Sequence, residues 1–375
     1  MPNKPMPSGQ YAVGTFTYTV YNDRDDINYP GTKRCISARV YYPVLKESVD
    51  GFKKAEYMSR EMASAFRKTY HLSKRFEDQR DSEDNSSECF VNAPRIDGVK
   101  FPLVVFSHGL SSYRESNSFM CLEIASHGYI VISLAHPHEA ILAEFDDGTS
   151  VSFDKALIKK QYEPFLPGVS KLMKLMKMKG SERELAEKFD AFQKKYSKCF
   201  MGRIAEWEKD TVAAVNYAKE NLSDLIDFSC GIAVTGHSFG GATAYALCLD
   251  HPEFVCGINI DGALFGDNWG KVLEKPFLQI GCKKNSNAEV RPLIDHSDVV
   301  YKAVFNDMEH AGFSDLKFVM NVKYMVGKLD ANVLHENLCK CHLEFYDAYL
   351  KKTKDKPSFT TNEAVTFTEY SPDIK

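Results

Sequence analysis

Residues 231–249 read GIAVTGHSFGGATAYALCL and place a β-branched apolar run, a glycine-rich turn and a helical run in direct succession. The turn carries the G-x-S-x-G pattern over residues 236–240, and a second glycine follows at Gly241. A strand that turns sharply into a helix presents the serine hydroxyl at its apex, as a nucleophile elbow requires. Glycine allows the turn and the close approach of strand and helix. The stretch therefore predicts Ser238 as a nucleophile; the alternative is a turn that only joins a strand to a helix.

Length and charge limit the class of protein. A chain of 375 residues can form one large α/β domain or two small ones. We expect a single domain over residues 1–375, with insertions at about 46–99 and 155–205. A formal net charge of −4 provides no basic field for nucleic acid. Residues 1–9 contain no apolar signal-peptide core and the ten cysteines are scattered, so we expect reduced thiols in a cytoplasmic protein.

The order of apolar runs predicts the fold class. Residues 11–21 and 35–42 alternate in polarity and are joined by a turn, which predicts an antiparallel hairpin at the start. From residue 101 onward, apolar runs alternate with helical segments, and we expect strands at 103–106, 129–134, 255–260, 277–281 and 299–305. This alternation indicates an α/β protein with a doubly wound, mostly parallel sheet, whose insertions form a helical cap.

The partners of Ser238 follow from chain order. On this fold the acid and then the histidine come after the serine, each in a loop at a strand's carboxyl end. His310 follows the strand expected at 299–305 and is the predicted base, with His296 as the second choice. Asp261 directly follows the strand at 255–260 and is the predicted acid. Its rivals are Asp267, Asp295 and Asp298, which are otherwise read as solvated loop carboxylates.

An oxyanion needs two N–H donors. The residue after the nucleophile, Phe239, supplies one, and Leu110 in the loop after the strand at 103–106 is the predicted second. The motifs His136-Pro137-His138 and Cys339-x-Cys341-His342 lack a second pair of ligands at zinc-finger spacing. We therefore expect no metal and no cofactor.

Several stretches resemble the platelet-activating factor acetylhydrolase family, the calcium-independent serine phospholipases A2 of the plasma and intracellular type II branch. They are VVFSHGL at 104–110, ASHGYIV at 125–131, GHSFGGAT at 236–243 and CGINID at 256–261. The resemblance implies an α/β-hydrolase fold with Ser238, Asp261 and His310 as the catalytic triad. It also implies Leu110 and Phe239 as oxyanion donors.

The resemblance further implies a substrate, namely the short or oxidised sn-2 acyl ester of a glycerophospholipid, as in 1-alkyl-2-acetylglycerophosphocholine esterases. His136 stands where the family has a more cationic stretch. Residues 261–265 lack the tryptophan that is common in the family, and they end at Phe265. We expect His136 and Phe265 to take part in substrate binding. The alternatives are a general carboxylesterase or thioesterase acting on soluble esters, and a catalytically silent binding protein of the same fold.

A phospholipase must reach a substrate held in a lipid surface, so we expect peripheral membrane contact. Residues 171–179, KLMKLMKMK, place Leu172, Met173, Leu175 and Met176 on one arc of a helix and lysines on the other. Residues 57–76 correspond to the family's lipid-facing helix and are the second candidate. The alternative for residues 171–179 is a cap helix whose apolar arc packs on the core.

Overall fold

A computed structural model describes residues 4–78, 85–284, 286–319 and 322–372. The contacts within the chain divide it into two compact units. The first comprises Met1–Asp154 and Thr211–Ser229, and the second comprises Lys155–Asp210 and Cys230–Lys375. The single domain expected from the sequence stays a prediction.

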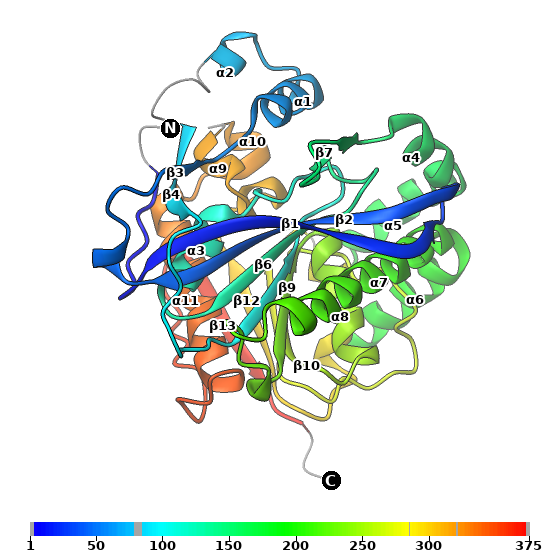
Figure 1. Cartoon of the computed structure of the whole chain (residues 1–375). Coiled ribbons are helices and arrows are strands. Elements are labelled where there is room, and N and C mark those ends of the chain that lie inside the picture. The colour runs from blue at the N-terminus through cyan, green and yellow to red at the C-terminus, as the bar shows by residue number, and fades with distance from the viewer. Residues whose placement is uncertain (1–3, 79–84, 285, 320–321, 373–375) are drawn as a thin grey trace. The chain divides into compact units, whose positions relative to one another are not determined.

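The first unit is built on the predicted hairpin. Strand β1 (Ala12–Asp26) pairs antiparallel with β2 (Tyr29–Val44), and both are longer than the alternating pattern indicated. In the sheet order β5-β6-β2-β1-β4-β3, strand β5 (Leu103–Ser107) runs parallel to β6 (Ile130–Ala135). Helix α3 (Ser118–Ser126) packs against β1, β2 and β6 (Figure 1). A small hairpin of β7 (Leu142–Glu144) and β8 (Ser150–Ser152) forms a separate two-stranded sheet.

The insertion at 46–99 differs from its prediction. Instead of one helix over 57–76, the structure has α1 (Arg60–Tyr70) and the short α2 (Arg75–Asp78). The Ser59 hydroxyl accepts the Met62 N–H at 2.9 Å and begins α1, and His71 ends it in the left-handed region at φ 54°. The strands β3 (Lys54–Glu56) and β4 (Ser86–Val91) were not predicted, because they are short and polar.

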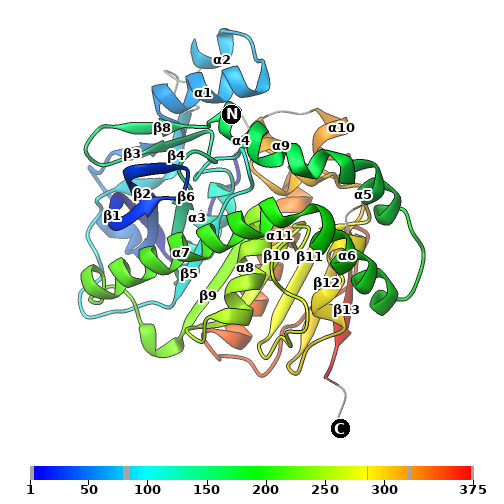
Figure 2. The ribbon, with the colours of Figure 1, turned by 90° about the vertical axis from the view of Figure 1, so that its right-hand side faces the viewer.

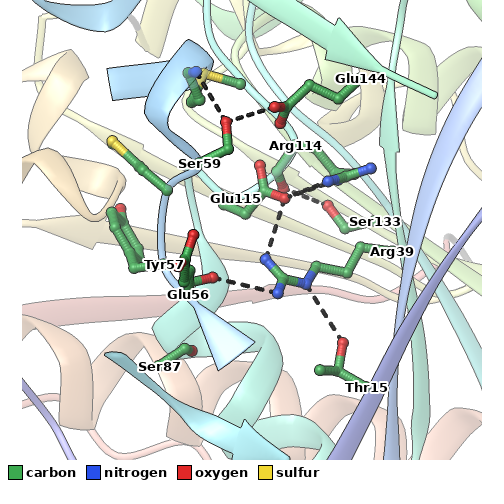
Figure 3. A network of polar contacts seen from close by, with 12 residues as sticks. Thr15, Arg39, Glu56, Tyr57, Ser59, Ser87, Arg114, Glu115, Ser133 and Glu144 are labelled. Atoms are coloured by element: carbon green, nitrogen blue, oxygen red, sulfur yellow. Dashed lines mark hydrogen bonds and ion pairs between the residues drawn. The ribbon is translucent and has the colours of Figure 1, made fainter. Parts of the chain in front are cut away.

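A buried ion network joins the strands of the first unit to one another (Figure 3). The Arg39 and Arg114 guanidinium groups both contact Oε1 of Glu115, at 3.2 and 2.7 Å. Arg39 also donates to the Glu56 carbonyl at 3.3 Å. The network lies along a cavity of about 270 Å³ that Lys53, Tyr57, Met62 and Glu144 also line. Since two cations share one carboxylate, Glu115 holds this network together.

The second unit contains a parallel sheet with an antiparallel edge. Its strands follow the order β13-β12-β11-β10-β9, and β9 (Ile232–His237), β10 (Phe254–Ile260), β11 (Phe277–Cys282) and β12 (Val300–Phe305) are parallel. Strand β13 (Val365–Tyr370), which was not predicted, pairs antiparallel with β12. Helices α8 (Phe239–Asp250) and α11 (Ala331–Tyr349) lie on opposite faces of this sheet (Figure 2). The doubly wound arrangement predicted for this part of the chain is therefore present.

The insertion at 155–205 is helical, as predicted. It contains α4 (Lys155–Tyr162), η4 (Glu163–Gly168), α5 (Val169–Met176), α6 (Glu182–Tyr196) and the start of α7 (Lys198–Asn221). Helix α6 is held to the loop after β10, because the Gln193 amide donates to the Leu264 carbonyl at 3.2 Å and accepts the Gly266 N–H at 3.0 Å. The ion pair between Asp190 and Arg291, at 3.3 Å, adds a second attachment.

Short helical turns complete the chain. They are η1 (Lys46–Ser48), η5 (Phe228–Cys230), η6 (Ser286–Ala288), η7 (Arg291–Leu293), η8 (His310–Phe313), α9 (Leu316–Val319) and α10 (Lys323–Val326). All ten cysteines are free thiols. Among the described residues, no helix has both the length and the apolar character needed to cross a bilayer.

The shared carboxylate of Glu115 gives a stability prediction. Glu115→Ala should lower the free energy of unfolding by about 3–5 kcal/mol, because it leaves two buried guanidinium groups without their carboxylate. Asp25→Ala is the matched control, since it removes an exposed ion pair with Lys33 and should cost about 1 kcal/mol or less. Urea unfolding of both variants measures the difference, and equal losses would contradict the role assigned to Glu115.

Candidate active site

Ser238 occupies a strained turn between β9 and α8. Its φ of 57° and ψ of −118° lie outside the regions that a residue with a Cβ usually adopts. The turn is fixed by backbone hydrogen bonds on both sides. The Ser238 N–H donates to the Ile260 carbonyl at 2.8 Å, and the Ser238 carbonyl accepts the Gly241 and Ala242 N–H groups at 3.0 and 3.1 Å. This geometry is that of the predicted elbow.

Glycine is required here because backbone and side-chain atoms already fill the space of a Cβ. At Gly236 an added Cβ would lie 2.2 Å from the Gly240 carbonyl carbon. At Gly241 it would lie 1.9 Å from Oδ1 of Asn259, and at Gly262 it would lie 2.1 Å from the Ser238 carbonyl oxygen. Strand, helix and the turn after β10 are therefore in direct backbone contact around the serine.

The structure brings Ser238, His310 and Asp261 together in the second unit. His310 Nε2 lies 2.9 Å from the Ser238 hydroxyl, and His310 Nδ1 lies 2.6 Å from Oδ2 of Asp261. A carboxylate only accepts hydrogen bonds, so Nδ1 carries the ring proton and the lone pair of Nε2 faces the serine. This arrangement allows the imidazole to accept the hydroxyl proton.

Asp261 is fully buried and held by two backbone groups. Its own N–H donates to the Ile280 carbonyl at 2.7 Å, and its Oδ1 accepts the Cys282 N–H at 2.7 Å. It has a left-handed conformation, with φ 54°. Because both bonds run to the end of β11, the carboxylate is fixed relative to the neighbouring strand.

His237 supports the histidine loop and was not identified from the sequence. Its Nε2 donates to the His310 carbonyl at 3.0 Å, and the two rings lie 4.8 Å apart. Burial, with a smaller contribution from the nearby His310, lowers the pKa of His237 to about 3. A neutral ring can lie beside His310 without repelling the imidazolium that forms during proton transfer.

The rival residues lie elsewhere in the second unit. His296 forms an isolated β-bridge with Leu273, and its Nδ1 lies 2.7 Å from the Asp298 carbonyl oxygen. Asp295 forms an ion pair with Arg291 at 3.0 Å, and Asp267 is exposed. His310, rather than His296, contacts the serine, and Asp261, rather than its rivals, contacts His310.

The predicted oxyanion donors lie in different units. Phe239 is the first residue of α8, so its N–H is one of those that an α-helix leaves without an intrahelical acceptor. Leu110 belongs to the first unit, in the turn after β5, where Ser111 N–H donates to the Glu139 carbonyl at 2.9 Å. The part of Leu110 in the oxyanion hole stays a prediction.

The two residues expected at the substrate have different surroundings. His136 is fully buried, and its Nε2 lies 3.2 Å from the Ser107 hydroxyl in the first unit. Phe265 is half-buried and stacks on Phe200 with ring centroids 4.4 Å apart. Phe200 in turn lies 6.1 Å from Phe239, the residue after the nucleophile. Phe265 thus belongs to an aromatic cluster that reaches the elbow, while a substrate contact of His136 stays a prediction.

Within the described residues, no group of three or more His, Cys, Asp or Glu side chains has the geometry of a metal site. His342, from one of the motifs considered, is buried on α11, and its Nδ1 lies 2.8 Å from the Leu338 carbonyl. His138, from the other motif, lies against the ring of Tyr29, with centroids 4.2 Å apart.

Comparison with known proteins gives a family match over most of the chain. Residues 2–364 match the family described as platelet-activating factor acetylhydrolase, isoform II. The platelet-activating factor acetylhydrolase of Gallus gallus is 27% identical over 283 residues, which cover 70% of this chain and 65% of the relative. That of Canis lupus familiaris is 28% identical over 281 residues, covering 70% and 60%.

A fungal relative in Arthroderma benhamiae, described as a probable 1-alkyl-2-acetylglycerophosphocholine esterase, is 23% identical over 281 residues, covering 68% of this chain and 60% of the relative. The chain therefore spans 60–65% of the length of these relatives. The solved structure of a ferulic acid esterase from Streptomyces cinnamoneus has a TM-score of 0.75 at 19% identity, covering 97% of this chain and 98% of that one. This likeness confirms the predicted α/β-hydrolase fold.

The crowding at the elbow gives a second stability prediction. Gly241→Ala places a Cβ 1.9 Å from Oδ1 of Asn259, so it should lower the free energy of unfolding by about 1–3 kcal/mol. Gly202→Ala is the control, since Gly202 lies in α7 with no atom within 4 Å of an added Cβ, and helix propensity should make it neutral or stabilising. Thermal unfolding compares them, and a tolerated Gly241→Ala would contradict the close packing.

Proposed function

Since the chain belongs to the platelet-activating factor acetylhydrolase isoform II family, we propose that it is a serine esterase that hydrolyses short or oxidised sn-2 acyl esters of glycerophospholipids. The proposal rests on the 2.9 Å contact between His310 Nε2 and the Ser238 hydroxyl at the apex of the elbow. The names of the vertebrate and fungal relatives support the substrate class.

In the first half of the reaction, Ser238 Oγ attacks the ester carbonyl carbon while His310 Nε2 takes the hydroxyl proton. Asp261 holds the ring through Nδ1 and stabilises the imidazolium. The carbonyl oxygen becomes an oxyanion, for which we assign the N–H groups of Phe239 and Leu110 as donors. The tetrahedral intermediate then expels the glycerol oxygen, which takes the proton from His310 and leaves as a lysophospholipid.

In the second half, water replaces the lysophospholipid. His310 takes a proton from the water as its oxygen attacks the acyl carbon on Ser238. The new tetrahedral intermediate releases the carboxylic acid, and the serine oxygen recovers its proton from His310. Every step is assigned to a side chain or backbone amide of the chain, so the activity should not depend on added calcium.

Substitutions at the site test the mechanism. Ser238→Ala should reduce kcat/KM for a short-acyl phosphatidylcholine by about four orders of magnitude or more, because the nucleophile is lost. Asp261→Asn should reduce it by about three to four orders, because the imidazole is held in the wrong tautomer. His296→Ala, which removes the rival histidine, is the matched control and should retain wild-type activity.

Retained turnover in Ser238→Ala, or a loss in His296→Ala as large as in the triad variants, would overturn the assignment. The same assay run on p-nitrophenyl esters and thioesters separates a phospholipase from a general esterase. Steep activation when the phospholipid forms an interface supports the lipid substrate. Equal rates on monomeric and aggregated substrates would favour the soluble-ester alternative.

We also propose that the segment from Lys155 to Gly180 contacts an anionic lipid surface. It contains seven lysines and one acidic residue, Glu163, in a chain whose formal net charge is −4. Three of its large apolar side chains remain in solvent, with Leu166 exposed by 63%, Met173 by 58% and Val169 by 38%. Exposed apolar groups flanked by lysines suit the boundary between acyl chains and anionic headgroups.

Most of the apolar arc predicted for residues 171–179 is covered by the core in α5. The side of the helix that carries Met173 remains exposed, and this is the side that we propose faces lipid. Leu175 is buried and Leu172 and Met176 pack against a core cluster, whereas Met173 points to solvent. The C-terminal end of α5 is held by another segment of the second unit, because the Asn287 amide donates to the Leu175 and Met178 carbonyls at 2.8 Å each. In α1, the other candidate, the large apolar residues Met62 and Phe66 are buried.

Vesicle binding distinguishes the two segments. Lys174→Gln with Lys177→Gln should weaken binding to phosphatidylserine-containing vesicles roughly 30-fold, at about 1 kcal/mol per lysine. Arg60→Gln with Lys68→Gln on α1 is the control and should leave binding unchanged. Co-sedimentation at low and high salt measures both, and a reversed pattern would move the contact to α1.

With ten free thiols, the protein fits a reducing compartment, and we propose a cytoplasmic, peripherally membrane-associated location.

A further inference from the structure

Glu289 is a buried carboxyl group that the mechanism above does not use. It follows η6 in the second unit and is 2% exposed. Its side chain packs against the backbone of Gly281, where an added Cβ would lie 2.5 Å from Oε2 of Glu289. The next residue, Cys282, donates its N–H to Asp261 at 2.7 Å. Glu289 therefore lies behind the peptide that holds the catalytic acid.

Two buried amides connect Glu289 to the turn that carries Asp261. The Glu289 carboxyl hydrogen-bonds the side chain of Gln279, whose Oε1 accepts from Nδ2 of Asn259 at 2.8 Å. Asn259 bonds both backbone groups of Gly262, accepting its N–H at 3.0 Å and donating to its carbonyl at 2.8 Å. All three side chains are fully or almost fully buried, so the network fixes the turn from inside.

The surroundings of Glu289 favour its uncharged form. Its Oε1 has no hydrogen-bond partner among the described residues, and an ionised carboxylate in such a place would be costly. The groups that face it are Asp261 at the end of β10, Cys282 at the end of β11 and Lys302 on β12. Burial and then the charge of Asp261 raise the pKa of Glu289 well above its usual range, and the opposing effects of Lys302 and of the hydrogen bond with Gln279 are smaller.

We propose that Glu289 is a positioning residue of the catalytic site, an uncharged carboxylic acid that fixes the Gly281–Cys282 peptide and the Asp261 turn. The inference rests on the proposed function, because it acts through Asp261 on His310. An ionised Glu289 would place a second negative charge beside Asp261 and stabilise the proton on His310, so that less of the ring would be free to accept the Ser238 proton. The neutral acid keeps the hydrogen bond with Gln279 without that charge.

Two substitutions at position 289 separate positioning from charge. Glu289→Gln keeps a neutral, hydrogen-bonding group and should hold kcat for p-nitrophenyl acetate within about threefold of wild type. Glu289→Ala should lower kcat by about 10–100-fold with KM within about twofold, because a misplaced acid misaligns the imidazole. The acid limb of the kcat/KM profile, which reports protonation of the base, should coincide in wild type and Glu289→Gln.

The controls make each outcome decisive. Glu187→Gln, at an exposed position on α6, should match wild type in every measurement. Wild-type kcat in a folded Glu289→Ala would overturn the positioning role. An acid limb displaced to lower pH by half a unit or more in Glu289→Gln would show that the native group is ionised, which also overturns it. Labelling with a fluorophosphonate separates the two proposals, since failure of the wild type to label at Ser238 would count against the proposed function.

A double-mutant cycle tests the contact itself and does not depend on Glu289→Ala alone. Gly281→Ala should reduce kcat about tenfold, because its Cβ meets the Glu289 carboxyl and displaces the neighbouring peptide. In the Glu289→Ala background the same change should have a much smaller effect, because the obstructing group is gone. Additive losses would show that Gly281 and Glu289 act independently, contrary to the proposal.

Discussion

Helix α8 approaches the ends of β9 and β10 so closely that a side chain fits at none of residues 236, 241 and 262. This approach forces Ser238 into its strained conformation and aims the helix start at the space beside its hydroxyl. The strain is held by backbone hydrogen bonds from Ser238 to Ile260 and from Gly241 and Ala242 to Ser238. The position of Asp261 follows from it, because Asp261 and Gly262 continue directly from the strand that α8 covers.

Charge at the site is confined by burial. Asp261 is fully enclosed and receives the Cys282 N–H and the His310 ring, so its oxygens face donors. His237, which lies against the His310 ring, stays neutral because burial lowers its pKa to about 3. In the proposed mechanism, the serine proton therefore moves to His310, which lies between the serine and the acid. Neutral neighbours let the imidazole gain a charge without a competing one nearby.

The elbow and the residues that the structure brings to it could be predicted from the sequence, because each depends on local patterns at strand ends. Ser238 lies between an apolar run and a helical one, and Asp261 and His310 directly follow apolar runs. The residues around them could not be read in this way, because His237, Asn259 and Glu289 contact other segments of the chain, at His310, Gln279 and Gly281, and no local pattern marks them. The short polar strands β3 and β4 carry little apolar signal, and the exposure of Met173 depends on which arc of α5 the core covers.

In the proposed reaction, Ser238 carries the acyl group between the two half-reactions. Mass spectrometry of enzyme quenched during hydrolysis of a 2-acetyl phospholipid tests it most directly. We expect an acetyl group on the peptide that contains Ser238, with accumulation increased when deacylation is slowed at low pH. An acetyl group on another residue, or steady turnover with no covalent species under any quench condition, would contradict it.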